Sequence, residues 1–214
     1  MIAQQKSQHQ CLIYEGSPLE QLPGLASMTK EKLAQNYRCL YLNSPLMVEK
    51  MRSCLTAAGV DVANAIAKDR LVLSSETAVS ADGSFDADIM MHKLEEALDQ
   101  TLKDGFKGLF ATGDMTWEFG SKESFAKLLE YEWRLEKLFR RRSELCGICQ
   151  YHSDTLPNEV IRQGLLSHPT IFVNETLSLI NQYYSQSESD AEHESKNPDL
   201  DKKISMLCRS QYAY

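Results

Sequence analysis

Short runs of apolar residues alternate along the chain with longer stretches in which apolar residues recur every three or four positions. The short runs lack the strict apolar–polar alternation of a half-exposed strand, which is typical of strands buried on both faces of a parallel sheet. The longer stretches have the spacing of amphipathic helices. Strands are therefore predicted at 11–14, 38–43, 70–74, 107–112, 146–151 and 170–173.

Helices are predicted between these strands. The stretch 45–58 carries clear boundary signals, because Ser44 precedes Pro45 at the first helical position and Gly59 follows the last turn. Strands that alternate with helices indicate an α/β fold, with a mostly parallel central sheet of five to six strands and helices on both faces. The predicted helices span 19–35, 45–58, 86–103, 122–141, 157–167 and 176–183.

The composition changes after Tyr184. Residues 185–203 are rich in Ser, Glu, Asp, Asn and Lys and hold almost no apolar side chain, which is typical of a solvated linker. Residues 204–207 predict one further helical turn. We therefore expect one domain followed by an acidic, flexible tail over 185–214.

Charge restricts the classes of partner. The 214 residues carry a net charge of −7, and nucleic-acid binding rests on Lys and Arg, so neither nucleic acid nor an anionic membrane is an expected partner. No apolar run approaches the roughly 18–20 residues of a membrane span. The first ten residues lack the apolar segment of a signal peptide. A cytoplasmic protein is expected, with its six cysteines as free thiols.

The first predicted strand leads into a loop, 15–18, where a nucleotide-binding α/β protein carries its phosphate loop. Such a loop needs G-x-x-x-x-G-K-[ST], with the lysine on the β- and γ-phosphates. Glu20, Gln21 and Leu22 stand where Gly-Lys-Ser/Thr would be expected, and a carboxylate repels a triphosphate. This degenerate loop favours sensing or scaffolding over nucleotide turnover.

The densest polar segment follows the fourth predicted strand and holds Asp114, Trp117 and Glu118. Ligands of open α/β sheets bind at the carboxyl ends of the strands. Asp114 stands where such folds place a magnesium-binding carboxylate, and Glu118 where a catalytic carboxylate could lie. The alternatives are an Asx-turn residue for Asp114 and a surface acid near a helix start for Glu118.

Two other strand ends add candidates to the same edge. Tyr14 and Glu15 follow the first strand, and Tyr151 and His152 end the fifth. A carboxylate at Glu15 favours a neutral or cationic ligand, and the alternative is a cap on the following helix. For His152 the alternative is a rim or capping residue.

Cys146 and Cys149, with His152, His9 and Cys11, are candidate zinc ligands. C-x-x-C is a ligand spacing, but structural zinc sites place it on a tight turn. Here both cysteines lie in a predicted strand, where they point to opposite faces. No metal site and no cofactor are therefore expected.

The predicted helix 122–141 carries two carboxylates one turn apart, Glu132 and Glu136, which repel each other. Arg134 is expected to relieve both charges. Trp133, in the same helix, is expected in the core.

Six blocks occur in order along the chain: His9-Gln-Cys11-Leu-Ile-Tyr14-Glu15, Arg38-Cys39-Leu-Tyr41-Leu-Asn, Gly105-Phe-Lys-Gly-Leu, Gly113-Asp114-Met-Thr-Trp117-Glu118, Leu129-Glu-Tyr131-Glu132 and Ile148-Cys149-Gln-Tyr151. Together they resemble the MEDS domain, the sensory domain named from methanogens, methylotrophs and the dichloromethane regulator. The likeness covers residues 8–184. It implies a three-layer fold similar to that of the KaiC/RecA-like ATPases, in a family that lacks the phosphate-loop lysine as this chain does.

The resemblance also implies a function. Such domains are usually fused to histidine kinases or DNA-binding regulators and are thought to sense small molecules, hydrocarbon derivatives included. This sequence shows no output module of either kind. We therefore expect a stand-alone sensor, or one that signals in trans to a histidine kinase or response regulator of a two-component system, and a homo-oligomer is also considered.

Three functions stay open from the sequence. The first is a non-catalytic sensory domain that binds a small organic ligand or a signalling partner at the carboxyl edge of the sheet. The second is a degenerate nucleotide-binding protein or weak ATPase, and the third is a structural adaptor that uses the tail. The candidate ligand-binding residues are Tyr14, Glu15, Arg38, Asp114, Trp117, Glu118, Tyr151 and His152.

Overall fold

Seven strands form one sheet in the order β3-β2-β4-β5-β1-β6-β7. The computed structural model describes residues 8–76, 85–115, 125–174, 176–187 and 198–209. All neighbouring strands pair in parallel except β6 and β7, which are antiparallel. The strands are β1 (His9–Tyr14), β2 (Tyr37–Leu42), β3 (Leu71–Ser74), β4 (Gly108–Asp114), β5 (Leu145–His152), β6 (Thr170–Phe172) and β7 (Ser178–Ile180).

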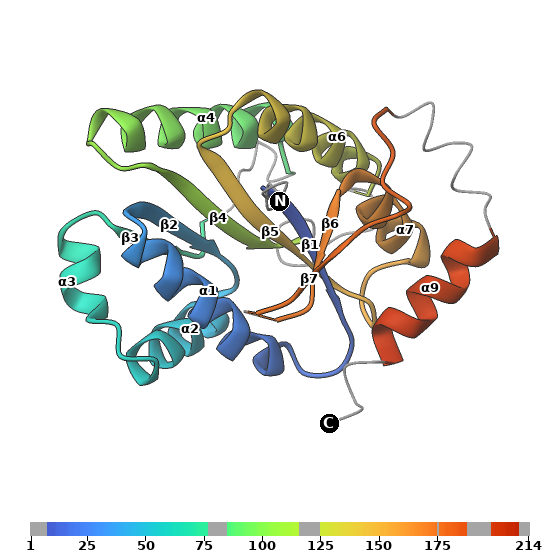
Figure 1. Cartoon of the computed structure of the whole chain (residues 1–214), viewed down its shortest axis with the longest axis horizontal. Coiled ribbons are helices and arrows are strands. Elements are labelled where there is room, and N and C mark those ends of the chain that lie inside the picture. The colour runs from blue at the N-terminus through green and yellow to red at the C-terminus, as the bar shows by residue number, and fades with distance from the viewer. Residues whose placement is uncertain (1–7, 77–84, 116–124, 175, 188–197, 210–214) are drawn as a thin grey trace, which may run out of the picture.

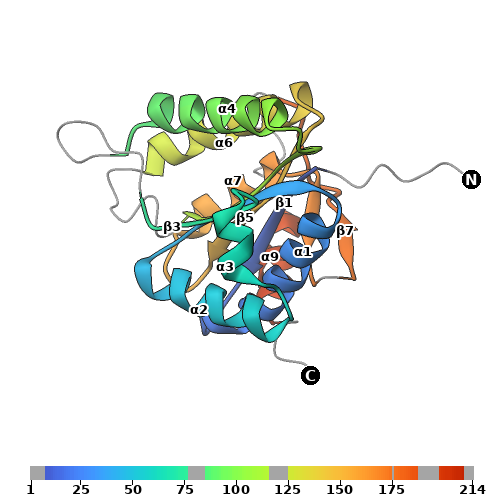
Figure 2. The same ribbon diagram turned by 90° about the vertical axis from the view of Figure 1, so that its left-hand side faces the viewer.

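Helices cover the two faces of the sheet as separate layers. In Figures 1 and 2, α1, α2 and α3 lie on one face, and α4, α6 and α7 lie on the other. We call these the α1 layer and the α6 layer. The helices are α1 (Leu22–Ala34), preceded by a 3-10 turn (Pro18–Gln21), α2 (Pro45–Ala57), α3 (Val62–Ala67), α4 (Ala87–Lys103), α6 (Phe125–Arg141), α7 (Asn158–Ser167) and α9 (Pro198–Arg209).

The expected α/β fold is confirmed, and each predicted strand is present within a few residues. The chain leaves β1 through α1 and returns in β2, beyond β5 and β4. Neighbouring strands β1 and β5 therefore lead into helices on opposite faces, and so do β2 and β4. In open α/β sheets, a ligand crevice forms at the carboxyl ends of such strands.

Two helical assignments from the sequence need correction. The predicted helix 176–183 is wrong, because Ser178–Ile180 forms strand β7. The side chain of Asn174 accepts hydrogen bonds from the backbone of Thr176 and Leu177, which closes an Asx turn and sends the chain back along β6. The short helix α3 was not predicted, although Asp61 caps it by accepting a hydrogen bond from the Asn64 amide.

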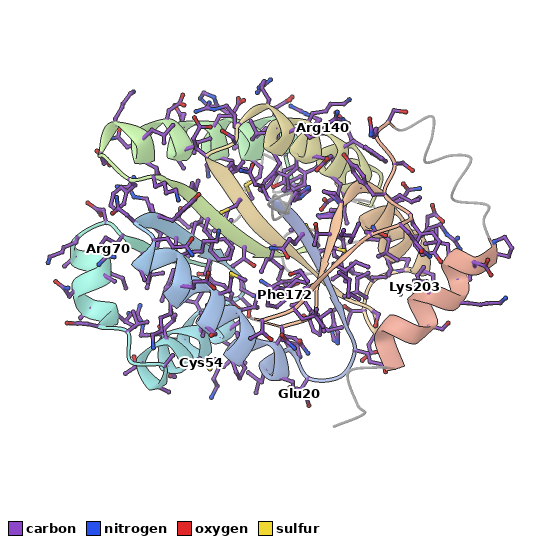
Figure 3. All side chains as sticks on the ribbon, in the orientation of Figure 1. Glu20, Cys54, Arg70, Arg140, Phe172 and Lys203 are labelled. Carbon is purple, nitrogen blue, oxygen red and sulfur yellow. The ribbon has the colours of Figure 1, made fainter. Side chains whose placement is uncertain are left out.

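Two hydrophobic clusters fill the spaces between the sheet and the helical layers, and the side chains there are drawn in Figure 3. Along β5, Cys146 and Ile148 belong to the α1-layer cluster, whereas Cys149 and Tyr151 belong to the α6-layer cluster. The prediction that Cys146 and Cys149 point to opposite faces is thus confirmed. Trp133 is buried in the core, also as predicted. The five cysteines whose side chains the structure describes are free thiols.

The expectation of a solvated linker through residue 203 is wrong for its last part. Helix α9 begins at Pro198, and its side chains Leu200 and Ile204 are buried. Arg162 of α7 forms an ion pair with Asp201 of α9. The two apolar residues lie four positions apart and form one narrow apolar stripe on the helix. Most of the surrounding residues are polar, so the composition of this segment does not reveal the stripe.

We predict that Leu200→Ala destabilises the protein. Leu200 is 0% exposed, so its truncation removes apolar contacts and leaves a cavity, at a cost of about 2–5 kcal/mol in the free energy of unfolding. Urea denaturation measures this change. Ser205→Ala, at an exposed position of the same helix, is the control and should change stability by less than about 0.5 kcal/mol. Equal stability of the two variants would show that α9 does not pack on the domain.

Candidate functional site

A buried carboxylate connects the carboxyl ends of three strands. Asp114 ends β4 and is 5% exposed. Its Oδ2 accepts a hydrogen bond from the hydroxyl of Tyr14 (3.2 Å), at the end of β1, and lies 3.4 Å from the Nδ2 of Asn43, which follows β2. Asn43 also donates to the hydroxyl of Tyr41. Burial, together with the neighbouring Asp114, raises the pKa of Tyr14, so the tyrosine stays a hydrogen-bond donor.

His152 and the loop after β1 extend this polar edge. The imidazole of His152 stacks on the ring of Tyr14 with centroids 4.9 Å apart, and its Nε2 lies 2.9 Å from the carbonyl oxygen of Gly16. Gly16 has a positive φ of 77°, a conformation that glycine adopts without steric cost. Its amide donates to the carboxylate of Asp154 (2.7 Å). A protein carboxylate thus takes an amide that a phosphate loop would offer to a phosphate.

The structure brings together part of the site expected from the sequence. Tyr14, Asp114 and His152 lie at one edge on the α1-layer side, and Glu15 lies beside them in the loop. Two further candidates lie elsewhere, and Trp117 and Glu118 fall outside the described residues.

Arg38 and Tyr151 are the candidates that lie away from this edge. Arg38 is at the amino end of β2, where its guanidinium binds the carboxylate of Asp104 (2.6 Å) and the carbonyl oxygen of Asp69. Tyr151 is 0% exposed and projects into the α6 layer, because it precedes His152 on β5 and successive strand residues face opposite ways. Burial raises the pKa of Tyr151.

An apolar cavity of about 220 Å³ lies on the α6-layer side, between the sheet and helices α4 and α6. Glu76 and Lys93 are the charged residues among those that line it. Gly113 and Met115 also line it, so the cavity reaches the carboxyl end of β4, while Asp114 between them belongs to the polar edge. Its apolar wall includes Leu42, Leu94, Ala97, Ala111, Leu135 and Phe139.

Sequence reasoning missed this cavity because its lining has the residue types and spacing of an ordinary core. The one available signal is the size of the side chains. Ala97, Ala111 and Gly113 are small residues on elements whose other inward positions carry bulky side chains. A close-packed core fills such positions from the opposite element, and here space remains.

A second buried group of polar side chains occupies the α6 layer. Donor atoms of His9, Glu132, Cys149 and His168 all lie within 4.8 Å of one another. Of the residues considered as metal ligands from the sequence, only His9 and Cys149 belong to this group. Burial lowers the pKa of His9 to about 3 and raises that of Glu132 to about 8.

The expected role of Arg134 is not observed. Its guanidinium binds Asp88 (2.6 Å) and lies 3.5 Å from Glu130 on the outer side of α6. Glu132 and Glu136 face inward instead, as buried residues. Two carboxylates on the buried stripe of an amphipathic helix were the signal in the sequence that pointed to a polar centre.

Comparison with known families gives one match. The sequence model of the MEDS family, described as the methanogen/methylotroph, DcmR sensory domain, matches residues 8–169, which is most of the chain. No curated protein matches the sequence. Among the described residues, no helix combines the length and hydropathy of a membrane span. The matched range contains the polar edge, the cavity and the buried polar group. The chain therefore belongs to the MEDS family of sensory domains.

Proposed function

We propose that this chain is a non-catalytic sensory domain of the cytoplasm that binds a small, largely apolar organic molecule in the cavity between the sheet, α4 and α6. The apolar lining and the volume of about 220 Å³ carry the proposal. An apolar protein cavity of about 150 Å³ holds benzene, so this one has room for a ligand of roughly six to ten non-hydrogen atoms. Glu76 and Lys93 offer charged partners for one polar group of that ligand.

The position of the cavity suggests how occupancy becomes a signal. Gly113 and Met115 touch the cavity, and Asp114 between them holds Tyr14 across the carboxyl edge. A ligand that displaces the end of β4 also acts on this hydrogen bond. Binding would thus shift an existing equilibrium between two arrangements of the strand ends.

The signal would pass to a separate protein, a histidine kinase or a response regulator, or to a second copy of this chain. Support for a protein contact comes from the β6–β7 end of the sheet. Val173, Leu177 and Ile180 are exposed there, with 76% of Ile180 accessible. Exposed apolar side chains beside an edge strand are typical of contact surfaces.

We predict that Ala97→Leu blocks the cavity. The substitution adds three carbon atoms to the cavity wall on α4, so the affinity for toluene, used as a small apolar probe, should fall at least about tenfold. The toluene-induced rise in the melting temperature measures this affinity. Ala63→Leu, at an exposed position of α3, is the matched control and should keep the wild-type response.

The Asp114→Asn variant distinguishes a ligand in the cavity from a ligand at the carboxyl edge of the sheet. Because Asp114 belongs to the polar edge and not to the cavity lining, this variant should still bind toluene, with an affinity changed only by the coupling to the Tyr14–Asp114 hydrogen bond. Loss of binding in Asp114→Asn together with normal binding in Ala97→Leu would place the ligand at the carboxyl edge. Equal binding by the Ala97→Leu and Ala63→Leu variants would remove the cavity from the proposal.

Nucleotide binding is the alternative function, favoured by the position of Asp114 at the end of β4. The contact between the Gly16 amide and the Asp154 carboxylate opposes it, because a phosphate would have to displace that carboxylate and would be repelled by it. We therefore expect millimolar MgATP to change the melting temperature by less than about 1 °C. A larger, magnesium-dependent rise accompanied by heat of binding would favour the nucleotide-binding alternative instead.

A further inference from the structure

Four buried side chains from four parts of the chain converge in the α6 layer. His9 begins β1, Glu132 lies on α6, Cys149 on β5, and His168 follows α7. Each is at most 5% exposed. All four carry atoms that bind metals, and these atoms lie within 4.8 Å of one another.

The hydrogen bonds of the two imidazoles fix which nitrogen faces this centre. Nδ1 of His168 lies 2.6 Å from the carbonyl oxygen of Gly164. A carbonyl only accepts, so Nδ1 carries the hydrogen and Nε2 keeps a lone pair. Nδ1 of His9 likewise lies 2.8 Å from a carboxylate oxygen of Glu136. An imidazole that donates its outer N–H to a carboxylate or carbonyl is the usual arrangement of a zinc-bound histidine.

Glu132 and His168 present buried polar atoms to this centre that have no hydrogen-bond partner among the described residues. Nε2 of His168 lies 3.7 Å from Oε2 of Glu132, and neither this nitrogen nor either Glu132 oxygen has a hydrogen-bond partner among the described residues. Nε2 of His9 lies 3.5 Å from the sulfur of Cys149. A shared cation would satisfy the facing lone pairs of Glu132 and His168, which are otherwise costly to bury without partners.

We propose that His9, Glu132, Cys149 and His168 bind one zinc ion. Neighbouring ligand atoms of tetrahedral zinc lie about 3.3–3.6 Å apart, given metal–ligand bonds of roughly 2.0–2.3 Å. The 3.5 Å between Cys149 and His9 falls in this range, and the 3.7 Å between His168 and Glu132 lies just above it. Two imidazoles, a thiolate and a carboxylate suit zinc, whereas magnesium and calcium take oxygen ligands. The two ligand charges neutralise the ion, so the centre can be buried without net charge.

The surroundings make this a closed site that joins the sheet to two helices. The ring of Phe139 stacks on His9 with centroids 4.2 Å apart, and the His9 and His168 rings lie 3.9 Å apart. The ion would connect β1 and β5 with α6 and the end of α7. Cys149 and Phe139 also line the apolar cavity, but the zinc content is measured without an apolar ligand, so this proposal is tested separately from the proposed function.

The test is the zinc content of the full chain, expressed in zinc-supplemented medium and purified without a histidine tag or chelators. Elemental mass spectrometry should find about one zinc per chain. Cys149→Ser should lower this value at least about tenfold. Cys146→Ser is the matched control, since it replaces a buried thiol on the opposite face of the same strand, and it should keep the wild-type content.

Two results would overturn the proposal. One is a wild-type protein that holds less than about 0.1 zinc per chain and takes up none on titration. The other is equal zinc content in Cys149→Ser and Cys146→Ser, which would place the metal on other residues. If circular dichroism shows that Cys149→Ser does not fold, the absorption spectrum of cobalt-loaded wild-type protein tests the site instead. Thiolate-to-cobalt absorption supports the site, and bound cobalt without that absorption contradicts it.

Discussion

Parallel pairing of β4, β5 and β1 in a fixed register holds all three functional regions in place. Asp114 pairs with Gln150, and Tyr14 pairs with His152, so β1 and β5 end together and β4 ends two residues before them. The alternation of side chains along β5 then separates the two faces: His152 joins the polar edge, while Cys149 and Tyr151 enter the α6 layer. A shift of one residue in this pairing would exchange the two environments.

Gly147, in the middle of β5, allows the helical layer to approach this strand closely. A Cβ there would clash with the carbonyl oxygen of Ala111 and lie 3.1 Å from the ring of Phe139. Because that space is left free, Phe139 can lie against the strand and stack on His9. The orientation of the His9 imidazole therefore depends on the absence of one side chain on a neighbouring strand, in addition to its bond to Glu136.

The strands, and the meeting of Tyr14, Asp114 and His152, could be predicted because they depend on local runs and on the common edge of parallel strands. Tyr151 was wrongly placed at this edge, because the end of a strand alone does not fix the face. Strand alternation assigns Tyr151 to the face opposite His152. Arg38 lies at the amino end of its strand and could not share the edge.

The buried polar group and the cavity could not be predicted because they depend on packing between distant segments. His9 and His168 have no spacing pattern that relates them, and their rings meet only when β6 lies beside β1. A C-x-x-C motif identifies only ligands that are close in sequence. It therefore pointed to Cys146, whose side chain lies on the α1-layer side and faces away from the buried polar group. The cavity differs from a filled core only by a few small side chains, and sequence patterns do not report volume.

The folded unit is longer than the family match, which ends at residue 169. Strand β6 begins at Thr170 and pairs with β1 through Gln10 and Cys11. A protein cut at the end of the family match would leave β1 as an open edge with unpaired amides beside a fully buried cysteine, and such edges promote aggregation. For this chain, domain boundaries for expression or for fusion to a reporter belong after helix α9, which packs on the same unit through Leu200.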